Sequence, residues 1–319
     1  MSEGPSVLRH YLVGDRVLRV LARAEMATTV DALARSLAPL DEALVLAPPS
    51  APELEVDLRF VRERETPPQG EHLARGASRL PDGVVLDTGA GWAAIRQGLP
   101  VRIEASVPTE PSPVFARWML TVAVFVAVRH LGLFHLHSGL VETSEGGWLL
   151  VGSSGAAKST TTLLLAASGL VPRADDIVLL DEREGRVFPV ARPFHLSPDV
   201  VRAFPQWTRG AVAGARGKLD VPVARPDPAP VTIRAIVILL GPGEHTEIGP
   251  CEPLDALGHL LGESATLFVD PVRAKEHLDT LRRLVESVPL RTLRPGPEAI
   301  SEPGRLRQAL EEALRAGGS

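Results

Sequence analysis

One short segment constrains the fold of this chain more than any other. Residues 152–159 (Gly-Ser-Ser-Gly-Ala-Ala-Lys-Ser) follow the apolar run 148–151, which has the pattern of a buried strand, and precede 160–167, an uninterrupted helix-compatible run. Strand, glycine-containing loop and helix in this order are typical of a phosphate-binding P-loop, in which backbone N–H groups and the positive end of the helix dipole face an anion. The alternative is a Gly/Ser-rich turn between two ordinary elements, and the placement of the lysine and serine disfavours it.

Within this pattern, Lys158 is expected to reach the outer phosphates and the Ser159 hydroxyl to coordinate magnesium. The usual pattern has glycine directly before the lysine, whereas this chain has Ala157. Alanine is sterically acceptable there wherever φ stays negative, so we expect weakened nucleotide binding at worst. The predicted nucleotide-binding residues are Gly152, Ser153, Ser154, Gly155, Ala156, Ala157, Lys158, Ser159 and Thr160.

Two adjacent carboxylates, Asp175 and Asp176, come about one helix downstream and precede the strand pattern of residues 177–180. Adjacent carboxylates repel each other, and a bound cation or a hydrogen-bonded proton offsets that repulsion. Phosphoryl transfer needs both a magnesium ligand and a base for the incoming hydroxyl. The alternative is a solvated turn before a strand, which the neighbouring loop disfavours.

A histidine, His137, lies in the apolar run 134–141, which predicts a strand that pairs near the P-loop strand. A lone histidine in an apolar strand is commonly a packed core residue, but the nearby loop favours a role beside the aspartates. His135 and His137 share one strand face with no cysteine or carboxylate framework nearby. A structural zinc site is therefore not expected.

These three segments together resemble the C-terminal catalytic domain of the HPr kinase/phosphorylase family, in which a histidine–glycine strand, a P-loop and an alanine–aspartate–aspartate triplet occur in this order. The resemblance covers roughly residues 130–200. It implies an α/β fold with a P-loop-containing mixed-sheet kinase core (HPr kinase/PEP carboxykinase-like). It also implies that Asp175 accepts the proton of a substrate hydroxyl and that His137 holds or tunes this aspartate. By the same resemblance, Asp176 helps to bind magnesium. Which aspartate has which role stays open.

The chain also departs from that family. The bifunctional enzymes carry a further acidic residue in an arginine–glycine–leucine–glycine signature, which residues 216–219 do not reproduce, so phosphorylase activity is not expected. The chain is more similar to divergent HPr-kinase-like proteins of peptide-modification gene neighbourhoods. The resemblance implies a magnesium-dependent, ATP-using kinase that transfers a phosphoryl group to a serine hydroxyl of a peptide or small protein. GTP or pyrophosphate as the donor stays open.

Two other functions compete with this interpretation. One is a regulatory nucleotide-binding protein that retains ATP without useful chemistry. The other is a motor-type ATPase, since Asp181 and Glu182 follow the strand pattern 177–180. However, this pair comes only one helix after the loop, and residues 183–186 have the composition of a hairpin turn. We therefore expect both acids to be hairpin-end residues.

The composition favours two domains in one cytoplasmic protein. With 319 residues and 45% hydrophobic content, we expect a small α+β domain over residues 1–105 and the catalytic domain over 106–319. The net charge of −5, without a dense Lys/Arg block, disfavours nucleic acid or an anionic membrane as a partner. The single cysteine, Cys251, excludes an internal disulfide, and no secretory leader is recognisable. The sequence does not fix the oligomeric state, and a homo-oligomer stays open.

The remaining elements follow from periodicity and from glycine and proline positions. The apolar run 118–128 spans about half a bilayer, so we expect a buried helix that begins the catalytic domain and packs on its sheet. Residues 205–230 lack periodicity and predict a long loop, either a lid with Arg209, Arg216 and Lys218 or a solvent-facing insertion. His195 is expected to be a strand-end residue. We further predict strands at 54–61, 83–87 and 233–240 and helices at 29–38, 198–204, 253–261, 274–287 and 304–316.

Overall fold

The structure is a computed structural model of mixed α/β type with two large mixed sheets. Contacts between residues divide it into two compact units, one of Met1–Phe134 with Thr266–Lys275 and one of His135–Ala265 with Glu276–Ser319. The predicted domain boundary between residues 105 and 106 stays a prediction. The predicted helix at 29–38 lies outside the described residues. These are residues 6–24, 44–47, 51–61, 65–74, 76–89, 91–108, 113–190, 192–214, 217–221 and 227–316.

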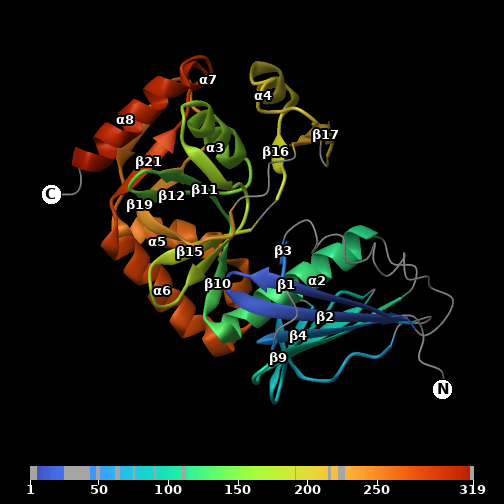
Figure 1. The fold of residues 1–319 in the computed structure, drawn as a ribbon. Helices are drawn as coiled ribbons and strands as arrows, with labels where there is room; N and C mark the ends of the chain where they lie inside the picture. The colour runs from blue at the N-terminus through green and yellow to red at the C-terminus, as the bar shows by residue number, and fades with distance from the viewer. Residues whose placement is uncertain are drawn as a thin grey trace. The chain divides into compact units, whose positions relative to one another are not determined.

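The first unit is built on a nine-stranded sheet with the order β3-β1-β2-β4-β9-β8-β7-β6-β5 (Figure 1). The pairs β2–β4 and β4–β9 are parallel, and the other pairs are antiparallel. The strands predicted at 54–61 and 83–87 are confirmed as β4 and β7. The strands are β1 (Ser6–Val13), β2 (Arg16–Ala24), β3 (Val45–Leu46), β4 (Leu54–Val61), β5 (Glu71–Ala74), β6 (Ala77–Leu80), β7 (Gly83–Asp87), β8 (Trp92–Arg96) and β9 (Val101–Pro108).

Helix α2 (Pro113–Val128) belongs to the first unit and is followed by the short helix η1 (Arg129–Leu131). It is buried over its second half, as the apolar run predicts. It packs against β8 and β9, so the expectation that it packs on the catalytic sheet is wrong. The physical reason is the short connection from β9, because a helix that closely follows a strand packs back on the sheet it leaves. Within the described part of the chain, no helix has the length and apolarity needed to cross a membrane.

The second unit contains a sheet with the order β10-β14-β15-β19-β12-β11-β13, and β21 adds to it by pairing with β19 and β20. Strands β12, β19 and β21 are parallel neighbours. The strand predicted at 233–240 is confirmed as β19. The strands are β10 (Leu133–Leu136), β11 (Ser138–Thr143), β12 (Gly146–Val151), β13 (Val171–Ala174), β14 (Val178–Asp181), β15 (Arg186–Pro189), β19 (Val231–Leu239), β20 (Glu247–Pro250) and β21 (Leu290–Arg294).

Helices cover both faces of this sheet, and Figure 1 shows α3 and α8 together on one face and α5 and α6 on the other. The helices predicted at 198–204, 253–261, 274–287 and 304–316 are confirmed within two residues. The helices of the C-terminal half are α3 (Lys158–Ala167), α4 (Pro198–Ala203), α5 (Pro253–Gly262), η3 (Ala265–Phe268), η4 (Pro271–Arg273), α6 (Ala274–Ser287), α7 (Glu298–Ser301) and α8 (Pro303–Ala316).

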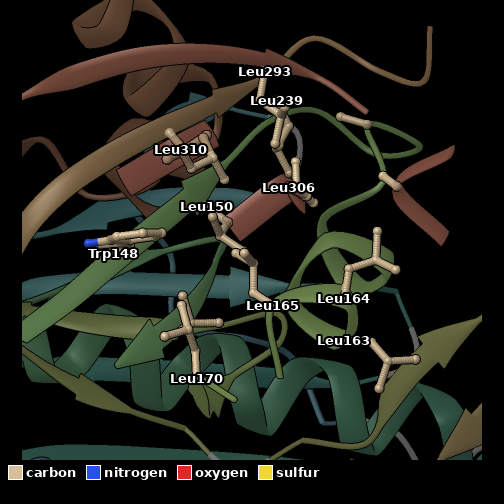
Figure 2. Close-up of a cluster of buried hydrophobic side chains, with 14 of the residues drawn as sticks. Trp148, Leu150, Leu163, Leu164, Leu165, Leu170, Leu239, Leu293, Leu306 and Leu310 are labelled. Carbon is tan, nitrogen blue, oxygen red and sulfur yellow. The ribbon is translucent and has the colours of Figure 1, made fainter. Parts of the chain in front are cut away.

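A leucine-rich core holds β12, α3 and α8 together (Figure 2). Full burial of each leucine contributes about 2 kcal/mol of transfer free energy, so this core anchors both elements that flank the loop at 152–157. The loop therefore starts and ends on rigid supports. The labelled core residues are Trp148 and Leu150 of β12, Leu163, Leu164 and Leu165 of α3, Leu306 and Leu310 of α8, and Leu170, Leu239 and Leu293.

Two sequence predictions in this unit need correction. The apolar run 134–141 is not one strand, because the chain bends at His137 from β10, which pairs with β14, to β11, which pairs with β12 and β13. Residues 205–230 are not all loop. They contribute β17 (Val212–Ala213) and β18 (Leu219–Val221) to a small sheet with β16 (Phe194–Leu196). These strands of two and three residues are too short to show an alternating pattern.

Candidate functional site

The loop between β12 and α3 leaves the sheet at the C-terminal end of the parallel strands, the edge where α/β proteins commonly bind ligands. Two glycines shape it. A Cβ at Gly152 would lie 2.6 Å from the carbonyl oxygen of Leu239, and Gly155 has a φ of +89°. Both positions therefore require glycine. Because Ala157 at the N-cap of α3 has no side-chain oxygen, it cannot cap the first amides of the helix, which suits an anion there.

Ala157 does not have the backbone conformation that the sequence analysis assumed. Its φ is 71° and its ψ is 25°, and among the described residues it is the one non-glycine with a positive φ. The expectation that alanine fits at negative φ therefore does not apply. A left-handed conformation costs an alanine about 1–2 kcal/mol, because its Cβ approaches a carbonyl oxygen. The glycine of the usual pattern would avoid this cost.

Lys158 is folded back over the loop, and its side chain is only 7% exposed. Its ammonium donates to the carbonyl oxygens of Gly152 and Ser153, the latter at 3.3 Å, and lies 3.7 Å from Glu263 Oε2. Burial lowers the pKa of Lys158, while the carboxylates of Glu263, Asp176 and Asp175 act in the opposite direction. The predicted phosphate-binding lysine therefore lies within the field of both predicted aspartates.

His137 joins two carboxylates. Its Nε2 lies 2.7 Å from Asp176 Oδ1 and its Nδ1 lies 2.5 Å from Glu263 Oε2. Burial alone would lower the pKa of His137, but these two hydrogen bonds raise it to about 9. The ring is therefore an imidazolium at neutral pH and donates from both nitrogens. The sequence left open which aspartate has which role, and the structure pairs His137 with Asp176.

The two aspartates differ sharply in environment. Asp176 Oδ2 also accepts a hydrogen bond from Arg192, at 2.5 Å. Burial alone would raise the pKa of Asp176, but His137 and Arg192 hold it well below the ordinary value. Asp175 is 3% exposed, and burial raises its pKa to about 7, although the nearby Ser159 hydroxyl and the His195 amide counteract this. One carboxyl is thus permanently ionised, and the other titrates near neutral pH.

Asp175 accepts a hydrogen bond from His195, which was expected to be only a strand-end residue. The backbone N–H of His195 donates to Asp175 Oδ2 at 3.4 Å, and the His195 Nδ1 lies 2.7 Å from Asp220 Oδ1 across β16 and β18. Within the described part of the chain, no hydrogen-bond partner contacts Asp175 Oδ1. His195 is therefore not merely a strand-end residue, since it connects the small sheet to the acidic pair.

Gly139, the residue two after His137, explains why this strand can lie against the loop helix. A Cβ at Gly139 would be 2.7 Å from Thr162 Oγ1 of α3 and 3.4 Å from the Leu150 Cβ. Strand β11 and helix α3 therefore come close together only because position 139 lacks a side chain. This close packing brings the His137 corner next to the acidic pair, as the hydrogen bond from the Ser138 amide to the Asp176 carbonyl shows (3.2 Å).

Glu263 and Arg192 were missed in the sequence analysis. Glu263 is 126 residues from His137 and follows α5, so no local motif connects it with the loop. Arg192 lies beyond the β14–β15 hairpin. The remaining predicted residues of the loop have different exposures: Ser153, Ser154 and Gly155 are exposed, Ala156 is buried, and Thr160 is half-buried in the first turn of α3.

The acids considered for a motor-type ATPase lie at a hairpin, as predicted. Asp181 accepts a hydrogen bond from the Arg183 amide at 2.9 Å and pairs with Arg186 at 3.1 Å, which are turn contacts. Of the three basic residues considered for a lid, Arg209 and Lys218 are exposed, and Arg216 lies outside the described residues.

No protein-family model matches this sequence, and no curated protein matches it as a relative. Among the residues that the structure describes, no group of three or more His, Cys, Asp or Glu side chains has the arrangement of a metal site.

Proposed function

We propose that this chain is a magnesium-dependent, ATP-using kinase of the HPr-kinase-like type, with a P-loop core, that phosphorylates a serine hydroxyl of a peptide or small protein. One observation carries the proposal. Lys158 and Ser159 of the loop and the pair Asp175–Asp176 lie in one cluster with His137. Phosphoryl transfer uses a loop that binds phosphate, a carboxylate that helps to hold magnesium and a carboxylate that accepts the hydroxyl proton, and this cluster offers a candidate for each.

The residues present suit magnesium and a nucleotide. Loop amides, the start of α3 and Lys158 offer donors and positive charge for phosphates. Mg²⁺ commonly takes one or two carboxylates and completes its shell with substrate phosphates and water, so Asp176 and the Ser159 hydroxyl would suffice on the protein side. When bound, Mg·ATP supplies the phosphoryl group and the positive charge that neutralises it during transfer. Asp176 stays ionised despite its burial because His137 and Arg192 lower its pKa, and its Oδ2 would exchange Arg192 for Mg²⁺ while His137 keeps Oδ1.

Asp175 suits the role of general base. An effective base has a pKa near the working pH, and burial raises the pKa of Asp175 to about 7. The His195 amide fixes one of its oxygens, at 3.4 Å. The carboxyl of Asp175 would accept the proton of the acceptor hydroxyl. Rate enhancement then comes from positioning and charge neutralisation, and no covalent enzyme intermediate is needed.

The test is isothermal titration with Mg·ATP together with a phosphate-transfer assay on candidate serine peptides. Lys158→Ala is expected to remove nucleotide affinity. Asp175→Asn is expected to keep the affinity and to lower transfer at least 100-fold, the contribution of a general base. Asp199→Asn, which neutralises an exposed carboxylate on α4, is the matched control and should change neither property. Equal transfer by Asp175→Asn and the unmodified protein would rule out the base role.

A regulatory nucleotide-binding protein is the second candidate, and the strained Ala157 is the observation that favours it, because an impaired loop can bind ATP without transfer. Binding of Mg·ATP without transfer to any serine peptide would support this candidate. The turn contacts of Asp181 count against a motor-type ATPase. The proposal includes a cytoplasmic location, where ATP is available, and no nucleic acid or membrane partner. It leaves homo-oligomer formation to solution measurement.

A further inference from the structure

Glu263 occupies a fixed position at the end of α5. Its amide donates to the His259 carbonyl (3.2 Å) as the last turn of the helix closes. Its own carbonyl accepts a hydrogen bond from the His137 amide at 3.0 Å. Both backbone groups of Glu263 are thus tied, one to its own helix and one to the corner between β10 and β11. The side chain, 13% exposed, therefore starts from a well-defined point.

A single carboxylate oxygen of Glu263 serves two cations. Oε2 lies 2.5 Å from His137 Nδ1 and 3.7 Å from Lys158 Nζ. The shorter contact is a hydrogen bond, and the longer one is an ion pair without hydrogen-bond geometry. Glu263 therefore binds His137 tightly and Lys158 loosely. The two contacts need not break together.

The loose contact is located where a phosphate would have to bind. Lys158 is buried, and its ammonium is satisfied by loop carbonyls and by the charge of Glu263. An anion that enters the loop must draw Lys158 away from these partners, and it meets the negative charge of Glu263 at short range. Like charges at such a separation disfavour each other strongly at low local dielectric. Glu263 thus competes with an incoming phosphate for the same ammonium.

We propose that Glu263 is a positioning residue that holds Lys158 before a phosphate binds and releases it to the phosphate during the reaction cycle. In the resting site its carboxylate holds both Lys158 and His137. When a phosphate binds, Lys158 moves to the phosphate, while Glu263 keeps His137 oriented toward Asp176. The inference rests on the proposed function, because that function assigns the loop an anionic ligand and includes His137 in the cluster that performs the transfer. It goes beyond that function by naming what restrains the lysine before binding.

The test uses the full chain with Glu263→Gln, which removes the charge and keeps the shape. Titration with inorganic pyrophosphate and with ATP in the presence of EDTA is expected to show roughly tenfold tighter binding, because one repulsive charge is gone. In the transfer assay, KM for Mg·ATP should fall because the repulsive charge is gone. The value of kcat should also fall, because His137 loses its charged partner. A purely structural role would instead raise KM.

Glu252→Gln is the matched control, since Glu252 is exposed at the opposite end of α5, about 16 Å away along the helix at 1.5 Å per residue. It should leave pyrophosphate affinity unchanged. If Glu263→Gln does not fold, Glu263→Asp withdraws the carboxylate by one methylene and should shift the affinity in the same direction. Unchanged or weaker pyrophosphate binding in these folded variants overturns the inference. Tighter binding without any transfer would support it and contradict only the kinase proposal.

Discussion

The backbone strain at Ala157 can be tested directly, because glycine is the residue favoured in its left-handed conformation. With φ at 71° and ψ at 25°, an alanine bears about 1–2 kcal/mol of strain that a glycine does not. Glycine also makes the unfolded chain more flexible, which offsets about 0.4–1 kcal/mol of the gain. Ala157→Gly should therefore raise the free energy of unfolding by about 0.5 kcal/mol. Most single substitutions lower it.

The neighbouring Ala156 provides the matched control. It is 4% exposed, belongs to the core around α3, and does not have a positive φ. Ala156→Gly loses buried apolar surface and adds unfolded-state flexibility, so it should lower the free energy of unfolding by about 1 kcal/mol. The same chemical change at adjacent positions is thus expected to have opposite signs, with a difference of about 1.5 kcal/mol.

Urea unfolding followed by tryptophan fluorescence measures this difference, because Trp148 is 6% exposed in the core that contains Ala156. A shift of the midpoint at constant m-value reports stability alone. Titration with Mg·ATP on the same samples shows whether relief of strain also strengthens binding. A loss of stability in Ala157→Gly as large as that in Ala156→Gly would refute the strain argument.

The remaining predictions concern packing and pH. Gly139→Ala should lower the free energy of unfolding by about 2 kcal/mol, because the added Cβ would lie 2.7 Å from Thr162 Oγ1. Thermal unfolding of Gly139→Ala with and without Thr162→Ala checks whether this contact is the cause. Asp175→Asn should raise stability at pH 8, by on the order of 2 kcal/mol, and leave it nearly unchanged at pH 4. The folded pKa of about 7 lies above the unfolded value, so the charged form disfavours the fold as pH rises, and urea unfolding at both pH values measures the effect. The raised pKa of His137, about 9, stabilises the fold fully below its unfolded pKa of 6.5, and this contribution is lost as pH rises through 9. In His137→Gln the difference in urea midpoint between pH 6 and pH 10 should be smaller than in the unmodified protein.

The parts of the fold that sequence predicts well are those decided by local pattern. Helices α6 and α8 have apolar residues at helical spacing, and β19 begins with alternating buried and exposed residues and ends in the apolar run 235–239. The bend at His137 could not be predicted in this way. The residues on both sides of it are apolar, so a strand that ends and a strand that begins give the same pattern as one longer strand. Only the different partners of β10 and β11 separate them.

In the candidate site, too, local sequence patterns reveal some residues, whereas the contacts between side chains depend on the tertiary fold. Lys158, Ser159, Asp175 and Asp176 lie in or beside elements whose order the sequence reveals, and the structure brings them together. The pairing of His137 with Asp176 instead of Asp175 could not be predicted. Two neighbouring side chains in one turn point in directions that the sequence spacing does not determine, and the fold at this turn decides which of them contacts the histidine.

Glu263 is electrostatically unfavourable at its position at the end of α5, and this helps to identify it as a residue of the candidate site. A carboxylate at the C-terminal end of α5 faces the negative end of the helix dipole, which costs stability unless a cation compensates for it. Lys158 and His137 are the cations that compensate. Ala157, an alanine in a left-handed conformation, violates a local preference in the same way. Residues that contradict local preferences without loss of the fold concentrate at functional sites. Ala157 lies in the loop at 152–157, and Glu263 contacts Lys158, the residue directly after this loop, so both exceptions support a functional site here.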